Sequence, residues 1–131
     1  MAAALPAGAA LGCDLELIEP RSREFVQDFF TAGERARLER STAADHPLLA
    51  NLLWSAKESA LKALRQGLRL DTRSVEVVAV RLAEPADSGA WSPLSVRSHG
   101  TGDTFHGWWR RDGDCVVTLA AAPAPALPFP L

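Results

Sequence analysis

The sequence predicts an α+β fold in which an antiparallel sheet packs against a long helix and shorter helices. Three observations predict it. An alternating stretch at residues 11–19 is typical of a strand. A long stretch between about residues 45 and 67 carries apolar residues at helical spacing. Four stretches rich in β-branched or aromatic residues, each bounded by turn residues, fill most of the remaining chain.

The size and composition of the chain fit one cytoplasmic domain. Its 131 residues leave room for one ordinary core, and 47% are hydrophobic. The net charge of −2 gives no basic field, so no nucleic-acid partner is expected. No apolar run has membrane-spanning length, and the first ten residues lack the basic residues of a signal peptide, so no membrane partner is expected. Cys13 and Cys115 lie far apart without metal-binding spacing, as in a reduced protein.

Both ends of the chain have low complexity. We expect residues 1–10 to be a linker, residues 11–122 to be the folded domain, and residues 123–131 to be an extended proline-rich tail. Such ends favour a domain derived from a longer multidomain chain.

The first strand should have one apolar face. Alternation predicts that four residues point towards the core, namely Leu11, Cys13, Leu15 and Leu17. The intervening residues, Gly12, Asp14, Glu16 and Ile18, point to the other side.

Two short helices should follow this strand. The first is expected at about residues 22–30. Thr31 and Glu34 have the spacing of a capping box, in which each side chain accepts a hydrogen bond from the backbone of the other residue. This box predicts a second helix that runs to about Arg40.

The longest helix should begin with Asp45 as its cap and Pro47 in its first turn, and should end at Gly67. The remaining stretches, 74–82, 93–98, 103–109 and 114–120, are expected strands. Asp112-Gly113 predicts a tight hairpin turn between the last two strands.

Asp14 and Glu16 form an acidic pair on one face of the first strand, about 7 Å apart at the backbone. Two carboxylates this close repel unless a cation lies between them. The alternative is a solvated polar face on an edge strand. Glu58 and Lys62 are neighbours at i and i+4 on the long helix, where the alternative is a surface ion pair worth about 0.3–0.5 kcal/mol.

Lys57 and Lys62 are the only lysines, whereas the other twelve of the fourteen basic residues are arginine. An ammonium group is a compact charge that suits contact with phosphate oxygens, and arginine does not replace it equally. A hard cation such as Mg²⁺ binds two or three carboxylate oxygens together with substrate phosphate oxygens. Three carboxylates and two lysines therefore predict a site for Mg²⁺ and a polyphosphate-like anion.

Two motifs resemble those of the 4′-phosphopantetheinyl transferase superfamily: GCDLE at 12–16 and WSAKESALK at 54–62. The FFTxxE segment at 29–34 and Gly67-Leu68 resemble the family too, and the resemblance covers about residues 11–80. It implies an enzyme that transfers 4′-phosphopantetheine from coenzyme A, with magnesium, to a serine of an apo acyl or peptidyl carrier protein. The other product is adenosine 3′,5′-bisphosphate.

The resemblance also implies roles for particular residues. Asp14, Glu16 and Glu58 match the metal-binding acids, and Glu58 matches the residue that helps to remove the serine proton. Lys57 and Lys62 match lysines that contact phosphate, and we count Lys62 with Glu58 as catalytic. Near the end of the long helix, Arg65 is expected to contact coenzyme A; the alternative is a charge that favours the helix C-terminus.

The D-x-E and W-x-x-K-E forms resemble the C-terminal half of the surfactin-synthetase type, whose first half completes the coenzyme A cleft. We therefore expect self-association, with a trimer as one option, or pairing with a parent polyketide or fatty-acid synthase. Acidic carrier proteins should dock on a basic and partly apolar surface. The candidates for that surface are Arg21, Arg23, Arg35, Arg37, Phe25, Phe29 and Phe30; the alternative is solvated helix faces over a phenylalanine core.

The sequence is compatible with two other functions. One is a catalytically weak or inactive transferase-fold domain that acts as a docking or oligomerisation module in a synthase. The presence of all five chemical residues argues against it. The other is a small metal-dependent nucleotide-binding or hydrolytic domain that uses the same acids, although the chain has no glycine-rich phosphate loop.

Overall fold

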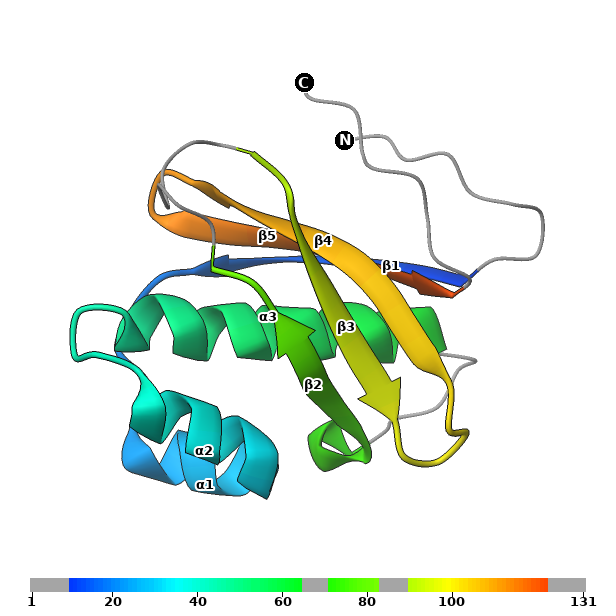
Figure 1. The fold of residues 1–131 in the computed structure, drawn as a ribbon, viewed down its shortest axis with the longest axis horizontal. Helices are drawn as coiled ribbons and strands as arrows, with labels where there is room; N and C mark the ends of the chain where they lie inside the picture. Colours follow the sequence, from blue (N-terminus) through cyan, green and yellow to red (C-terminus); the bar gives the residue numbers. More distant parts are fainter. Residues whose placement is uncertain (1–9, 65–70, 83–89, 123–131) are drawn as a thin grey trace.

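The computed structural model describes residues 10–64, 71–82 and 90–122, which form an α+β fold as predicted (Figure 1). Several expectations fall outside these residues: most of the N-terminal linker, Arg65, the helix stop at Gly67 and the proline-rich tail.

The sheet has five strands, and every neighbouring pair is antiparallel. Across the sheet lie β1 (Ala10–Leu17), β5 (Cys115–Ala122), β4 (Thr104–Asp112), β3 (Ser92–Ser98) and β2 (Val75–Val80). The first and last strands of the chain are therefore neighbours, and β1 and β2 form the two edges.

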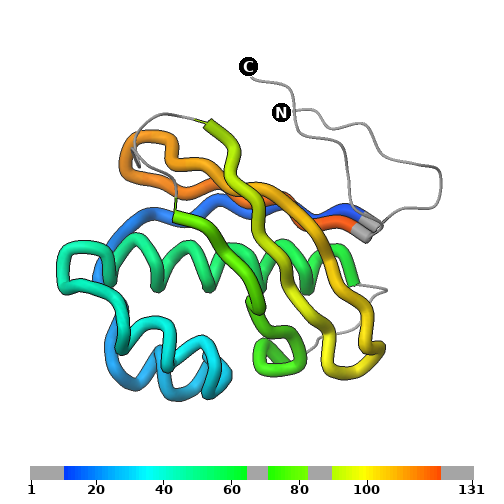
Figure 2. The backbone as a smooth tube through the Cα atoms, in the orientation of Figure 1, coloured from blue at the N-terminus to red at the C-terminus, as the bar shows by residue number. Residues whose placement is uncertain are grey.

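Helix α3 (His46–Leu64) runs along one face of the sheet and packs most extensively on β1 and β5 (Figures 1 and 2). The shorter helices α1 (Arg23–Phe29) and α2 (Ala32–Arg40) precede it, and a 3₁₀ turn at Thr72–Ser74 leads into β2. None of the helices in the described ranges has both the length and the apolarity needed to cross a membrane.

The expected capping box opens α2. The Thr31 hydroxyl accepts from the Glu34 amide at 3.2 Å, and a Glu34 carboxylate oxygen accepts from the Thr31 amide at 2.8 Å. Ser22 caps α1 in a similar way, since its hydroxyl accepts from the Phe25 amide at 3.0 Å. Local side-chain chemistry thus fixes where these two helices begin.

The core lies between α3 and the sheet. The helix contributes the apolar side chains that its spacing predicted, namely Leu48, Leu49, Leu52, Leu53, Ala56 and Ala60. The sheet contributes residues from four strands, among them Val75, Val96, Trp109 and Val116. The Trp109 ring is buried, and its Nε1 donates to the Arg81 carbonyl at 2.9 Å.

The prediction that the leucines of β1 point towards the core is wrong, because they lie on the exposed face of the strand. Leu11, Leu15 and Leu17 are 41%, 61% and 51% exposed, and Cys13 is exposed as well. The opposite face, which carries Gly12, meets α3. A Cβ at Gly12 would lie 1.8 Å from the Ser59 carbonyl oxygen, so only glycine allows this close approach.

The last two strands form the expected tight hairpin, shifted by one residue. Asp112 pairs with Cys115, so Gly113 and Asp114 are the central turn residues. Gly113 has φ of 60°, a left-handed value that suits glycine.

Candidate active site

Asp14 and Glu16 lie on the face of β1 that meets α3, close to Lys62. The Lys62 ammonium donates to a carboxylate oxygen of Asp14 at 2.9 Å and to the Cys13 carbonyl at 3.0 Å. The Asp14 side chain is only 8% exposed, whereas the Lys62 side chain is 45% exposed. Lys62 thus pairs across to the strand rather than with its helical neighbour Glu58.

Small and hydroxyl side chains bring α3 this close to β1 and β5. Thr118, which pairs with Asp14 in the sheet, has its hydroxyl 2.9 Å from the Ser55 hydroxyl and 2.6 Å from the Ser59 hydroxyl. The Thr118 hydroxyl also donates to the Ser55 carbonyl at 3.0 Å. These three residues are buried, so their hydrogen bonds stabilise the contact that Gly12 permits.

Arg21 lies beside Glu16. Its guanidinium Nη2 is 3.4 Å from the Glu16 carboxylate, and its Nε donates to the Asn51 side-chain oxygen at 2.8 Å. The Asn51 amide donates in turn to the carbonyls of Glu19 and Pro47, at 2.6 and 2.7 Å. Asn51 is buried and holds the segment after β1 in place, so Arg21 is fixed near the acids.

The site crowds negative charge. Burial, together with the neighbouring Asp14 carboxylate, raises the pKa of Glu16 to about 7, although Arg21 lowers it. Burial and the charge of Asp14 also raise the pKa of Glu58, which Lys62 opposes. The hydrogen bond to Asp14 raises the pKa of Lys62. The three carboxyl groups therefore repel one another, and Arg21 and Lys62 offset this repulsion only in part.

The residues fit a magnesium ion in part. The second carboxylate oxygen of Asp14 is buried and has no hydrogen-bond partner, which suits an oxygen ligand awaiting a cation. Magnesium needs only one or two protein carboxylates when substrate phosphates and water complete its shell. Within the described ranges, no three His, Cys, Asp or Glu side chains lie close enough together to hold a metal as they stand. Asp14 and Glu16 are thus the direct candidates, with Glu58 near enough to interact electrostatically.

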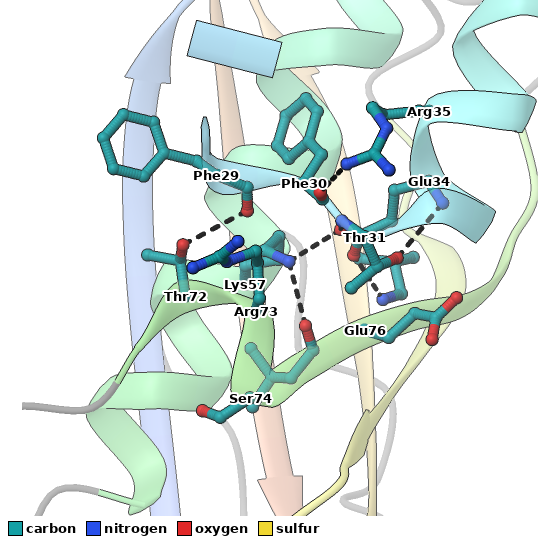
Figure 3. Close-up of polar contacts among 12 residues, drawn as sticks. Phe29, Phe30, Thr31, Glu34, Arg35, Lys57, Thr72, Arg73, Ser74 and Glu76 are labelled. Atoms are coloured by element: carbon teal, nitrogen blue, oxygen red, sulfur yellow. Dashed lines mark hydrogen bonds and ion pairs between the residues drawn. The ribbon is translucent and has the colours of Figure 1, made fainter. Parts of the chain in front are cut away.

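Lys57 lies elsewhere, and this differs from the expectation that it contacts phosphate. Its side chain is 0% exposed, and its ammonium is 2.6 Å from Glu34 and 2.9 Å from the Val75 carbonyl (Figure 3). In this structure it has no exposed surface from which to contact a phosphate. Arg65 lies outside the described residues.

Sequence reasoning missed two residues of the site and one partner. The sequence alone assigns no role in the site to Asn51, places Arg21 on the carrier-docking surface, and gives Glu34 only a capping role. A buried asparagine inside an apolar helix stretch was the available signal for Asn51, because such a side chain must find polar partners. No local signal links Glu34 with Lys57, which is 23 residues away.

The sheet of five antiparallel strands over one long helix, with acids and a lysine where β1 meets α3, defines a candidate phosphate-chemistry site. The family model of the 4′-phosphopantetheinyl transferase superfamily matches residues 10–107. The chain therefore belongs to the 4′-phosphopantetheinyl transferase superfamily. The search of curated proteins gave no match.

Proposed function

We propose that the chain transfers 4′-phosphopantetheine from coenzyme A to a serine of an apo acyl or peptidyl carrier protein, with magnesium. The single observation that supports this most strongly is the Asp14–Lys62 contact beside Glu16. This contact places the partly exposed Lys62 ammonium beside Asp14, whose second carboxylate oxygen has no hydrogen-bond partner, in a domain of the superfamily.

In this proposal Asp14 and Glu16 would hold the magnesium ion, with Glu58 as a third ligand, directly or through water. A bound magnesium ion would neutralise charge on the pyrophosphate of coenzyme A. Phosphoryl transfer asks a protein mainly for positioning and charge neutralisation, and this cluster could supply both.

Lys62 and Glu58 would then act on the reactants. Lys62 is exposed enough to leave Asp14 and contact a phosphate oxygen when coenzyme A binds. Glu58 would accept the serine proton, and its raised pKa makes it a stronger base than an ordinary glutamate. We assign phosphate contact to Lys62 and Arg65 rather than to Lys57, which is buried.

The proposed carrier-docking surface is an open groove of about 850 Å³ between α1, α2 and the start of α3. Arg21, Arg23 and Arg35 are among the residues that line it. Arg37 lies outside this lining and donates to the Val78 carbonyl at 2.7 Å. Phe25 packs beneath Arg21, with the guanidinium 4.7 Å from the ring centroid. A basic groove next to the acids suits the acidic surface of a carrier protein.

We further propose that a second copy or a parent polyketide or fatty-acid synthase completes the coenzyme A cleft. The stripe of Leu11, Leu15 and Leu17 on the outer face of β1 supports this, because exposed apolar stripes often mark interfaces. Residues 11–122 would be the folded unit, and the two free cysteines favour a cytoplasmic setting. The second candidate remains a weak or inactive docking module, which the partly assembled metal site favours.

The test is intact-protein mass spectrometry of a generic apo carrier protein after incubation with the chain, coenzyme A and magnesium. We expect the mass of one phosphopantetheine to be added, and a chelator to prevent the addition. If no mass is added even with carriers from several synthases, the docking-module function is favoured instead.

A further inference from the structure

The ammonium of Lys57 and the carboxylate of Glu34 form the only fully buried ion pair in the described part of the chain. Their N–O distance is 2.6 Å, and both side chains are 0% exposed. The Glu34 oxygens also accept from the amides of Thr31 and Val77 at 2.8 and 2.7 Å. The Lys57 ammonium donates to the Val75 carbonyl and lies 5.8 Å from the centre of the Phe30 ring.

This pair contributes little to stability by itself. Burial of two charges costs several kcal/mol per ion in desolvation, and apolar replacements of similar volume are often as stable. Burial lowers the pKa of Lys57, while the neighbouring Glu34 opposes that shift. A role in geometry explains the pair better than a role in stability does.

The pair connects three elements at one point. Glu34 comes from the first turn of α2 and Lys57 from the middle of α3, and Figure 3 shows the two side chains facing each other. Their backbone partners Val75 and Val77 belong to β2. On its other side, α3 bonds β5 through Ser59 and β1 through Lys62. Polar contacts therefore link α3 to both edge strands, β1 and β2. These contacts limit rotation of the helix about its axis.

Lys57 directly precedes Glu58, so the rotation that buries one side chain sets the direction of the other. Successive residues on a helix point about 100° apart. At a radius of about 5–6 Å, a rotation of roughly 20° moves a side-chain tip by about 2 Å. A misplacement of about 1 Å at a reacting group can cost roughly 100-fold in rate.

We propose that Lys57 and Glu34 are positioning residues, which fix the rotation of α3 so that Glu58 and Lys62 face Asp14 and Glu16. The proposal rests on the proposed transferase function, since it gives a purpose to that alignment. It also explains why a lysine stands here: its slim stem crosses the core and its compact head fits between a carboxylate and a carbonyl, where a planar guanidinium would need more space.

The test uses the full chain with the double variant Lys57→Met/Glu34→Gln. Methionine keeps an unbranched stem, and glutamine keeps the capping box, so no isolated charge is left in the core. The single variant Lys57→Met leaves a buried carboxylate without its partner and is expected to fold poorly. The matched control is Leu94→Ala, which creates a cavity in β3 at a buried residue whose strand partners are Val80 and Gly107 rather than residues bonded to the pair.

Three measurements are made on each protein: the unfolding temperature, the steady-state rates of transfer, and a crystal structure. We expect the double variant to fold, to lose the Lys62–Asp14 hydrogen bond through rotation of α3, and to lose about 100-fold in kcat. Its KM for coenzyme A should rise as well, because the rotation that moves Glu58 also moves Lys62, the side chain proposed to contact phosphate. Leu94→Ala should lower the unfolding temperature by roughly 5 °C or more and leave kcat unchanged.

The inference is overturned if α3 keeps its position in the double variant, or if it rotates without loss of kcat. Equal losses of kcat in the double variant and in Leu94→Ala would also overturn it, since general destabilisation would then explain both. If the unmodified chain makes no holo carrier protein, the proposed function fails. The position of α3 in the double variant then decides whether the pair orients the helix.

Discussion

Lys62 and Asp14 meet at 2.9 Å between α3 and β1, and the rest of the candidate site surrounds this contact. A cation already lies against the carboxylate that is best placed to bind magnesium. The same lysine is partly exposed, so it can be displaced when a metal and a phosphate arrive. The contact thus describes a resting arrangement in which Lys62 partly neutralises the acids.

Replacement of Lys62 should impair catalysis more than stability. Lys62→Met removes a partly exposed ion pair, which is worth about 0–1 kcal/mol, so the free energy of unfolding should change little. The value of kcat/KM for coenzyme A should fall at least about tenfold, because a charge-assisted contact to phosphate is lost. Steady-state kinetics and urea unfolding measure the two effects.

Lys62→Arg is the control for charge. Arginine keeps the positive charge but not the compact head that fits between Asp14 and the Cys13 carbonyl. We expect this variant to be clearly slower than the unmodified chain. Wild-type rates in Lys62→Arg would show that any cation suffices at this position.

Glu58→Gln should abolish transfer without harm to the fold. The substitution removes the proposed proton acceptor, and general-base groups contribute about 100- to 10,000-fold in rate. The unfolding temperature should stay the same or rise slightly, because one of three crowded carboxylates becomes neutral. Mass spectrometry of the carrier and a thermal melt check both parts. Retained transfer would remove Glu58 from the mechanism.

Magnesium affinity should increase with pH up to about pH 7. The pKa of Glu16 is raised from 4.5 to about 7 in the metal-free protein, so a metal that binds this carboxylate must displace a proton at lower pH. As the pH rises towards 7, the dissociation constant for magnesium should fall by up to about tenfold per pH unit. Above about pH 7 it should level off. Calorimetric titration of magnesium between pH 5.5 and 8 measures it. Glu16→Gln is the control, and an equally steep dependence in that variant would exclude Glu16 as the source.

The raised pKa of Glu16 also predicts how the stability of the metal-free protein depends on pH. Between pH 4.5 and 7 the folded state binds more protons at Glu16 than the unfolded state does. The contribution of Glu16 to stability is therefore fully present below pH 4.5 and is lost as the pH rises to about 7. Urea unfolding in chelator should show this trend in the unmodified chain and a weaker one in Glu16→Gln.

Gly12→Ala should separate α3 from β1. The added Cβ would lie 1.8 Å from the Ser59 carbonyl oxygen, which is backbone and cannot move aside alone. We expect a loss of at least about 1–3 kcal/mol in the free energy of unfolding, together with loss of transfer. Gly100→Ala is the matched control, since nothing lies within 4 Å of its added Cβ. Similar unfolding curves for the two variants would contradict the close approach.

Local patterns predicted most of the fold. The capping box at Thr31 and Glu34, the apolar spacing of α3 and the turn near Gly113 each depend on nearby residues, and the structure contains all three. The structure also brings together four of the predicted site residues: Asp14, Glu16, Glu58 and Lys62. The two motifs predicted this because one lies on β1 and the other on α3, which pack against each other.

Tertiary contacts decided what the sequence could not. The face of β1 that meets α3 was predicted wrongly, because alternation favours the leucines while the close approach at Gly12 selects the other side. Lys57 was expected to contact phosphate beside Glu58. Its partner Glu34 is distant in sequence, and only the packing of α2 on β2 and α3 reveals that both are buried.

The most direct measurement is the release of adenosine 3′,5′-bisphosphate from coenzyme A, followed by chromatography, with the unmodified chain and with Asp14→Asn. We predict release only when magnesium and an apo carrier protein are both present, in an amount equal to the holo carrier formed, and none with Asp14→Asn. Release without an acceptor would indicate a hydrolytic enzyme. Equal release from Asp14→Asn would show that the chemistry takes place away from the contact between β1 and α3.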